Sequence, residues 1–120
     1  MQISGLHHVA LNVLDVDAAV RFYTDVLGFE LLDTRPDFGF DGAWLQAGAN
    51  QVHLLGAPDA KIDIRQHYAL KVDDAEAWAD HIEGKGLKCR RSMYVPGAGR
   101  QVFVKDPSGN SIELNQPDHP

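Results

Sequence analysis

The sequence predicts an α+β fold made of two tandem βαβββ modules, whose curved mixed sheets surround a concave cleft. Three observations predict it: a repeated strand, an amphipathic helical stretch after each copy, and a series of short, turn-bounded strands after each helix. With 120 residues, of which 44% are hydrophobic and 23% charged, the chain has the size and composition of one globular domain. We therefore expect a single domain over residues 1–120.

The repeat lies at the start of each module. The segments HVALNV, from His8, and HYALKV, from His67, carry His, Ala, Leu and Val at the same places, 59 residues apart. Self-similarity at a fixed offset predicts a duplicated structural unit. The modules are expected over about 5–56 and about 65–116, joined by a linker over about 57–64.

A helix signal follows each repeated strand. Apolar residues recur at helical spacing over 16–27 and again over 75–82. Asp15 precedes the first stretch, and Asp73 or Asp74 precedes the second. These carboxylates are typical N-caps, so each module is expected to begin strand–helix.

Short strands are predicted after each helix, because runs rich in β-branched and aromatic residues alternate with turn residues. They lie near 29–35, 42–47, 51–55, 87–94, 100–105 and 111–115. The segment from Asp106 to Asn110 contains Pro and Gly where a tight turn requires them. Together with the two repeated strands and helices, these segments account for nearly the whole chain.

Charge and cysteine content disfavour several classes of protein. The formal net charge of −6 disfavours nucleic acids and anionic membrane surfaces as partners, since both are bound chiefly by clustered Lys and Arg. Cys89 is the single cysteine, so no intrachain disulfide forms, and the N-terminus lacks a signal-peptide pattern. No window reaches 18 uninterrupted apolar residues, as a membrane span would require. A cytoplasmic protein is expected.

Strand parity groups four potential metal ligands. Successive side chains point to opposite faces, and the apolar face of the first strand should cover the helix, which leaves His8 on the concave side and turns His7 towards the helix layer. The same rule places His53, His67 and Glu113 on the concave side. If the last strand of each module pairs beside its first, each module brings two of them together. Imidazole and carboxylate groups are ligands for divalent Fe, Mn, Ni, Co and Zn, so the four residues predict one bound divalent metal ion. His7 is the rival of His8, because parity alone separates them.

Aromatic and basic side chains near these strands are candidates for binding a small-molecule substrate. Trp44 and Phe103 are placed to line a pocket, although packing is the commoner fate of aromatic residues. Arg100 follows a glycine-rich loop and is a candidate for binding an anionic substrate group. Its competing interpretation is a solvent-exposed arginine.

Four segments carry a family resemblance: Leu6–Leu11, Ala19–Phe29, His67–Leu70 and Phe103–Leu114. The chain resembles the vicinal oxygen chelate superfamily, also called the glyoxalase, bleomycin-resistance and extradiol-dioxygenase group. The sequences FYTDVLGF and DPSGNSIEL are specific in combination.

The resemblance implies a metal that chelates two neighbouring oxygens of a substrate or intermediate, and it implies a homodimer. By position, His8, His67 and Glu113 resemble the ligands of the family, and Glu113 matches the carboxylate that moves a proton. Glyoxalase I-like members carry a glutamate where this chain has His53. The chain departs from their pattern at that position.

The leading hypothesis is a metal-dependent, glyoxalase-like isomerase or lyase acting on a small substrate with vicinal oxygens. One alternative is a non-haem iron dioxygenase, and another is a non-enzymatic, bleomycin-resistance-like drug-binding protein. Epimerase-like and fosfomycin-transferase-like chemistries remain open. The set of His8, His67 and Glu113 counts against the drug-binding protein, because a sequestering cleft does not need metal ligands.

Overall fold

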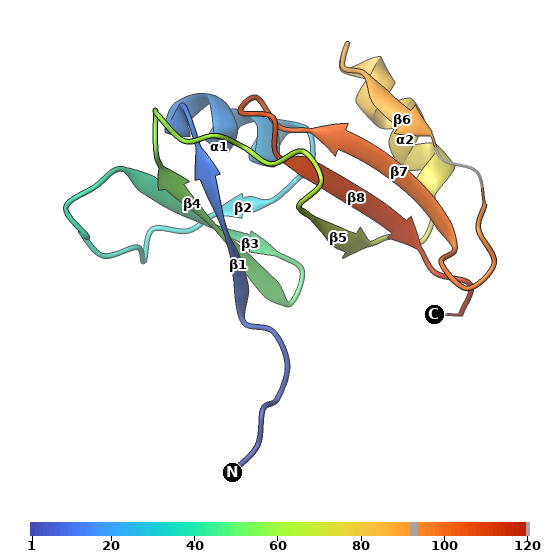
Figure 1. Ribbon diagram of the computed structural model, residues 1–120, viewed down its shortest axis with the longest axis horizontal. Coiled ribbons are helices and arrows are strands. Elements are labelled where there is room, and N and C mark those ends of the chain that lie inside the picture. The colour runs from blue at the N-terminus through green and yellow to red at the C-terminus, as the bar shows by residue number, and fades with distance from the viewer. Residues whose placement is uncertain (92–93, 120) are drawn as a thin grey trace. The chain divides into compact units, whose positions relative to one another are not determined.

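The computed structural model describes residues 1–91 and 94–119 (Figure 1). It consists of two compact units, residues 1–62 and 63–120, here called module one and module two. Module one contains β1 (His8–Val13), α1 (Val16–Asp25), β2 (Glu30–Leu31), β3 (Gly42–Ala47) and β4 (Asn50–Gly56). Module two contains β5 (His67–Lys71), α2 (Ala75–Gly84), β6 (Cys89–Arg91), β7 (Arg100–Lys105) and β8 (Ser111–Gln116). The α+β class and the βαβββ order are confirmed.

Each module forms one four-stranded mixed sheet, in the order β1-β4-β3-β2 or β5-β8-β7-β6. In both sheets the first strand pairs parallel with the last, and the other pairs are antiparallel. The first and last strands of a module are therefore neighbours. Residues far apart in the sequence come to lie side by side on the same sheet face.

Each helix covers one face of its own sheet and closes a small apolar core. Module one buries the side chains of Val13, Ala19, Tyr23, Leu45 and Leu54 completely. The corresponding residues of module two are Ala79, Ile82, Val102, Ile112 and Leu114. Burying a side chain of the Val, Leu or Ile size stabilises a protein by roughly 1.5–3 kcal/mol, so these positions fix which face of each strand turns to the helix.

The helix starts follow the capping residues. Asp15 accepts a hydrogen bond from the Ala18 N–H at 3.1 Å, and Asp74 accepts one from the Ala77 N–H at 3.0 Å. Asp74, rather than Asp73, is thus the cap of α2. A second acceptor comes from outside the helix, because the Gln116 Oε1 atom binds the Ala75 N–H at 3.0 Å.

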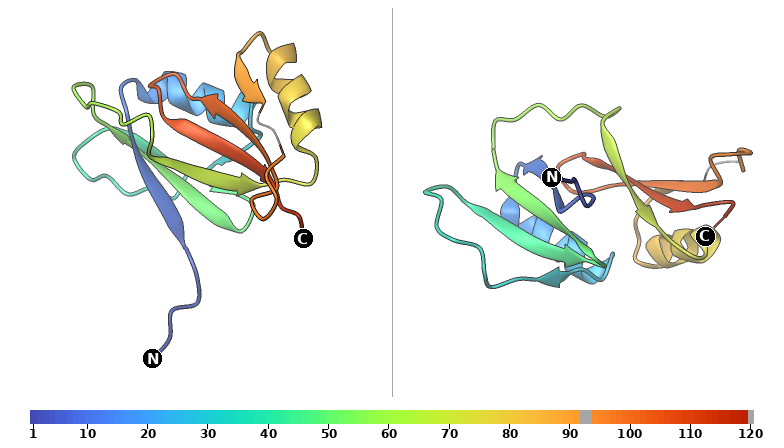
Figure 2. Two further views of the ribbon diagram at one scale, coloured as in Figure 1. Left: turned by 45° about the vertical axis from the view of Figure 1, so that its right-hand side comes forward. Right: turned by 90° about the horizontal axis from the view of Figure 1, so that it is seen from below.

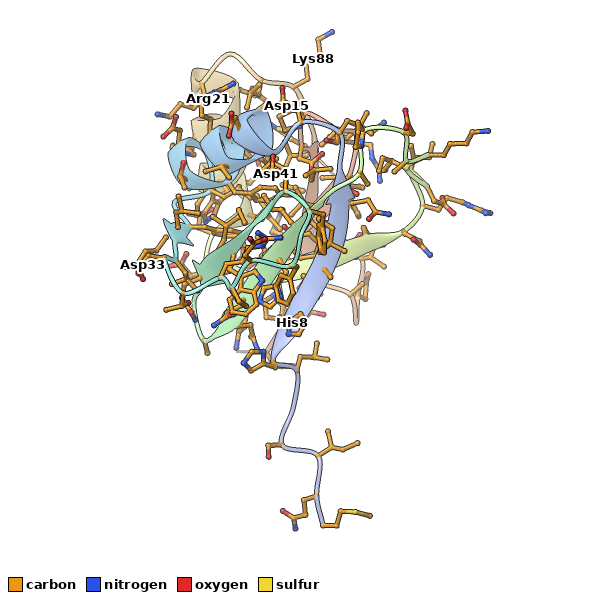
Figure 3. The ribbon with its side chains drawn as sticks, turned by 90° about the vertical axis from the view of Figure 1, so that its left-hand side faces the viewer. His8, Asp15, Arg21, Asp33, Asp41 and Lys88 are labelled. Carbon is orange, nitrogen blue, oxygen red and sulfur yellow. The ribbon has the colours of Figure 1, made fainter. Side chains whose placement is uncertain are left out.

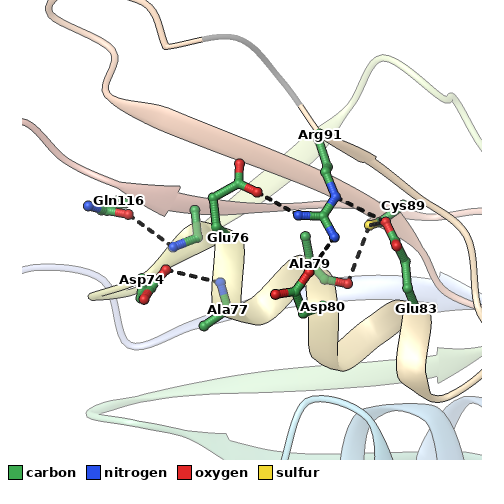
Figure 4. A network of polar contacts seen from close by, with 10 residues as sticks. Asp74, Glu76, Ala77, Ala79, Asp80, Glu83, Cys89, Arg91 and Gln116 are labelled. Atoms are coloured by element: carbon green, nitrogen blue, oxygen red, sulfur yellow. Dashed lines mark hydrogen bonds and ion pairs between the residues drawn. The ribbon is translucent and has the colours of Figure 1, made fainter.

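Arg91 fastens α2 to the edge strand of its sheet (Figure 4). Its guanidinium binds three carboxylates of α2, those of Glu76, Asp80 and Glu83. These bonds raise the pKa of Arg91, so the cation is permanent. Burial and the nearby Glu83 carboxylate raise the pKa of Cys89, which makes its thiol a poor nucleophile.

Two predicted strands are shorter than expected. The first, predicted near 29–35, is confined to Glu30–Leu31, because the segment after it is a loop in which Arg35 donates to the Phe40 carbonyl at 2.9 Å. The second, predicted near 87–94, is confined to Cys89–Arg91. Residues 92–93 of that prediction lie outside the described part of the chain.

Two turns shape the sheet of module two. Asp106, whose side chain is buried, accepts hydrogen bonds from the backbone N–H groups of Ser108 and Asn110, both at 2.9 Å. This closes the predicted tight turn between β7 and β8. Residues 95–99 form the other turn, in which Val95 and Gly99 make a β-bridge and the Ala98 carbonyl faces β8.

Residues 1–5 precede the first sheet and extend away from it (Figure 2), whereas the carbonyls of Leu6 and His7 accept hydrogen bonds from Asn50 and Gln51 of β4. Met1, Ile3 and Leu6 are largely exposed. Within the described ranges, no helix combines the length and the apolar character needed to cross a membrane.

Gly99 should be the least replaceable residue of the 95–99 turn. Its φ of +76° is left-handed, and a Cβ there would lie 2.2 Å from the Gln116 carbonyl oxygen. Gly97 is a matched control, since its φ is +85° but a Cβ would meet nothing within 4 Å. Both Ala variants incur the left-handed penalty of about 1–2 kcal/mol. We expect Gly99→Ala to lower the free energy of unfolding by about 1–3 kcal/mol more than Gly97→Ala does, as measured by urea denaturation. Equal losses would contradict the packing described for this turn.

Candidate metal centre

In module one, His8, Trp44 and His53 lie on one face of the sheet. The register brings β4 between β1 and β3, with His53 paired to Ala10 on one side and to Trp44 on the other. The ring of His53 stacks on that of His8, with centroids 3.9 Å apart, and on that of Trp44, at 4.3 Å. Figure 3 shows the His8 side chain at the start of β1. The three rings thus form a continuous stack.

His53 is the buried member of this stack, with 7% of the residue exposed. Its Nε2 atom lies 2.8 Å from the Oε1 atom of Gln51, two residues earlier on the same face. The Gln51 amide offers both a donor and an acceptor, so it can accompany either tautomer of the imidazole. Burial, and then the neighbouring rings of His8 and His7, hold the pKa of His53 below its usual 6.5. A neutral imidazole is the form that binds metals.

In module two, His67 and Glu113 lie side by side on the corresponding face. The His67 Nε2 and Glu113 Oε1 atoms are 3.1 Å apart, although the residues are 46 positions apart in the sequence. The parallel pairing of β5 with β8 produces this contact, because it sets Glu113 beside Ala69, two residues after His67. Glu113 is 6% exposed, whereas the His67 side chain is 39% exposed.

The contacts of His67 determine which of its ring nitrogens faces Glu113. Its Nδ1 atom lies 3.1 Å from the Arg65 carbonyl oxygen, which can only accept, so Nδ1 carries a proton. In the neutral ring Nε2 then holds a lone pair, and that lone pair faces the carboxylate of Glu113. Two lone pairs at this distance repel each other unless a cation, either a proton on Nε2 or a metal ion, lies with them. A histidine that donates its second N–H to a backbone carbonyl is also a common arrangement for a metal ligand.

Asn115 orients the Glu113 carboxylate. Its Nδ2 group donates to Glu113 Oε2 at 2.7 Å and to the Ala98 carbonyl at 3.0 Å. One amide therefore links the carboxylate to the 95–99 turn and leaves Oε1 for His67. Asn115 was not among the predicted site residues, although its position two residues after Glu113 on the same strand was a usable signal.

The other predicted residues have different surroundings. Phe103 lies on the same face as Glu113 and meets His67 edge-on, with centroids 5.5 Å apart. Arg100 lies on the opposite face by strand alternation, and its guanidinium is 5.8 Å from the ring centroid of Tyr94. His7 does not turn towards the helix layer, because β1 begins only at His8; its Nδ1 lies 2.9 Å from that of His8.

Each module thus gathers two of the four predicted ligands, His8 with His53 and His67 with Glu113. Across the described residues, no three His, Cys, Asp or Glu side chains are close enough together to hold a metal ion. The donor chemistry of both pairs nevertheless fits a divalent transition metal, since it consists of imidazole nitrogens and one carboxylate.

Comparison with protein families matches residues 5–114 to the family described as Glyoxalase/Bleomycin resistance protein/Dioxygenase superfamily. A relative from Synechocystis, named Probable lactoylglutathione lyase, is 34% identical over 92% of this chain and 94% of its own. Three relatives from Arabidopsis thaliana are longer, and the chain spans 71%, 34% and 43% of their lengths.

Two solved structures illustrate the range of the fold. An antibiotic binding protein from Streptomyces is 26% identical, with a TM-score of 0.82 and coverage of 98% of this chain and 99% of that one. The fosfomycin resistance protein FosX from Listeria monocytogenes, complexed with Mn(II), is 18% identical, with a TM-score of 0.81 and coverage of 98% and 95%. The latter similarity concerns the fold alone.

The lowered pKa of His53 predicts a pH dependence of stability. Because the folded state holds fewer protons on this ring than the unfolded chain, the stabilisation is fully present above pH about 6.5 and is lost as the pH falls below that value. We expect the free energy of unfolding of the metal-free protein, measured with urea, to fall between pH 7.5 and pH 5 (about the range in which histidine titrates). His53→Gln should reduce this fall, whereas His119→Gln, in the exposed tail, should leave it unchanged. An unchanged pH profile in His53→Gln would contradict the assignment.

Proposed function

The chain belongs to the Glyoxalase/Bleomycin resistance protein/Dioxygenase superfamily, and from this premise we propose that it is a metal-dependent, glyoxalase-like isomerase or lyase. Its substrate would be a small molecule with two neighbouring oxygen atoms. The observation that carries the proposal is the pairing of His67 Nε2 with Glu113 Oε1, held by Arg65 and Asn115. The relative named Probable lactoylglutathione lyase, 34% identical over nearly the full length, supports the same type of reaction.

We propose His8, His53, His67 and Glu113 as metal ligands. The 3.1 Å contact between His67 Nε2 and Glu113 Oε1 supports this set, because an imidazole nitrogen and a carboxylate oxygen this close together can bind the same cation. The lowered pKa of His53 supports it as well, since that ring is neutral near pH 7. A Mn(II) complex of FosX, which shares the fold, is consistent with a divalent ion.

The chemistry of the residues suits proton transfer next to a carbonyl. When bound, the metal would act as a Lewis acid for the two substrate oxygens. Glu113 is the base of this site, because its Oε1 atom is the carboxylate oxygen directed away from Asn115. Burial of Glu113 to 6% exposure excludes most water from the carboxylate. Asn115 holds Oε2, so Oε1 keeps its direction while it accepts and returns a proton.

His53 sets the charge of the proposed site. A divalent ion bound by neutral imidazoles and one carboxylate would keep a formal charge of about +1, against about zero for a set with two carboxylates. A positive centre favours substrates that ionise at their oxygens, since developing negative charge is stabilised in a poorly solvated site. The enediolate intermediates of an isomerase develop such charge.

A drug-binding protein is the second candidate. The antibiotic binding protein from Streptomyces, at 26% identity, and the partly exposed ring of Trp44 both favour it. A binding protein of that kind has no use for a base, so the two candidates differ in their dependence on Glu113.

Metal content tests the ligand assignment. We expect the full chain, purified without an affinity tag, to bind one divalent metal ion per chain by elemental analysis. His67→Ala combined with Glu113→Ala should abolish binding, because half of the ligands are lost. His119→Ala combined with Glu30→Ala is the matched control, removing one exposed histidine and one exposed glutamate, and should retain the metal. Stoichiometric metal in the first double variant would refute the assignment.

The reaction is tested with methylglyoxal and glutathione, whose thioester product is followed by its ultraviolet absorbance. The wild-type chain, loaded in turn with each of the five candidate metals, should form the thioester with at least one of them. Asn115→Ala should lower kcat by roughly 10²-fold with the metal retained, since a mispositioned base loses most of its catalytic effect. Asn50→Ala, which removes an amide side chain from module one, should leave kcat unchanged. Thioester formation with none of the metals would exclude this reaction.

A further inference from the structure

Module two contains a cavity of about 570 Å³ that adjoins the face carrying His67 and Glu113. Its wall combines apolar side chains, among them Leu87 and Phe103, with three cations, Lys88, Arg90 and Lys105. None of the described residues that line it is acidic. A cavity of this size holds a small molecule, and its composition suits a molecule with an apolar body and a negatively charged end.

The three cations are not engaged in holding the fold. Within the described ranges, none of them forms an ion pair or a side-chain hydrogen bond. The Arg90 guanidinium lies over the Phe103 ring, 4.6 Å from its centroid. All three residues are exposed, and Figure 3 shows Lys88 extended away from the ribbon. This contrasts with Arg91, whose guanidinium is fully occupied by α2.

The internal duplication provides a comparison within the same chain. Phe103 in β7 occupies the register position that Trp44 occupies in β3, beside Glu113 and His53 respectively. Counting from these positions, Lys88, Arg90 and Lys105 correspond to Glu30, Leu32 and Gln46. Module one forms the same four-stranded sheet with no cation at any of the three places. The fold therefore does not require positive charge here.

Phe103 joins the cavity to the proposed metal ligands. It lines the cavity, lies under Arg90 and contacts the ring of His67 edge-on at 5.5 Å. Ser111, also in the wall, pairs with His67 across the sheet. A molecule whose charged end is held by the cations would thus extend along Phe103 towards His67.

We propose that this cavity is an anion-binding subsite that holds a carboxylate or phosphate-type group of the substrate, with the adjoining apolar segment on Phe103 and Leu87. The proposal rests on the proposed function only in taking the ligand to be a substrate. The chain as a whole is acidic, with a net charge of −6, so most of it repels anions. Three cations at one cavity would attract an anion to this face.

Calorimetric titration of the metal-free full chain tests the subsite. The probes are phenylphosphonate, phenylacetate and benzyl alcohol, which present a ring with a phosphate-type group, a carboxylate or no charge. We expect at least one of the two anions to bind at least about tenfold more tightly than benzyl alcohol, with affinity falling as NaCl rises. The tighter of the two anions identifies which type of group the site holds.

The decisive variant replaces the cations together, as Lys88→Gln, Arg90→Leu and Lys105→Gln; the last two are the residues that module one carries. Affinity for the anion should fall at least about tenfold. Arg21→Gln, Lys61→Gln and Lys85→Gln remove the same charge outside the cavity and should change affinity less than about twofold. Lys88→Gln alone, at an exposed position, should give an intermediate loss and guards against a folding defect in the triple variant.

Three outcomes would overturn the subsite. The wild-type protein could bind benzyl alcohol as tightly as both anions, it could bind neither anion, or the folded triple variant could keep the anion affinity of the wild type. Elemental analysis of the same proteins, made before the metal is removed for the titrations, keeps the two proposals separate. Failure of the wild type to bind metal would count against the proposed function only, because the titrations are made without metal. Retained metal with unchanged anion affinity in the triple variant would count against the subsite only.

Discussion

The parallel pairing of the first strand of each module with its last strand is the constraint on which the structure depends. It brings β1 against β4 and β5 against β8, so His8 meets His53, and His67 meets Glu113, across a chain separation of more than forty residues. The apolar side chains on the opposite face fix the register, since a slip by one residue would exchange the buried and exposed faces. Core packing therefore positions the polar pairs that we assign to chemistry.

The two pairs are chemically different although the modules share one topology. In module one the ring of His53 stacks on those of His8 and Trp44, which is a favourable contact without any ion. In module two the Arg65 carbonyl oxygen accepts from Nδ1 of His67, so Nε2 faces the Glu113 carboxylate and the two atoms can share a proton or a metal ion. Module two also contains the cavity lined by cations. The two modules therefore share one sheet topology, but only module two combines a carboxylate ligand with a proposed anion-binding subsite.

Much of the fold could be predicted from the sequence, because alternation and helical periodicity record which side chains are buried. The repeat predicted both βαβββ units, and Asp15 marked its helix start correctly. Parity also predicted which face His8, His53, His67 and Glu113 share within each module. The direction of the His7 side chain was not predictable, because side chains alternate between faces only inside a strand and β1 begins one residue later, at His8. Contacts between side chains and distant backbone, such as Asn115 with Ala98, leave no periodic signal.

Nitrogen NMR of the histidine rings tests directly whether His67 and Glu113 bind a metal ion together. Two-bond correlation spectra of ¹⁵N-labelled protein, assigned with His67→Gln, report which ring nitrogen carries a proton. We expect Nδ1 of His67 to stay protonated with and without one equivalent of Zn²⁺. The Nε2 resonance should shift when Zn²⁺ is added. An Nε2 resonance that Zn²⁺ leaves unchanged, or a neutral ring protonated at Nε2, would contradict the proposed metal site.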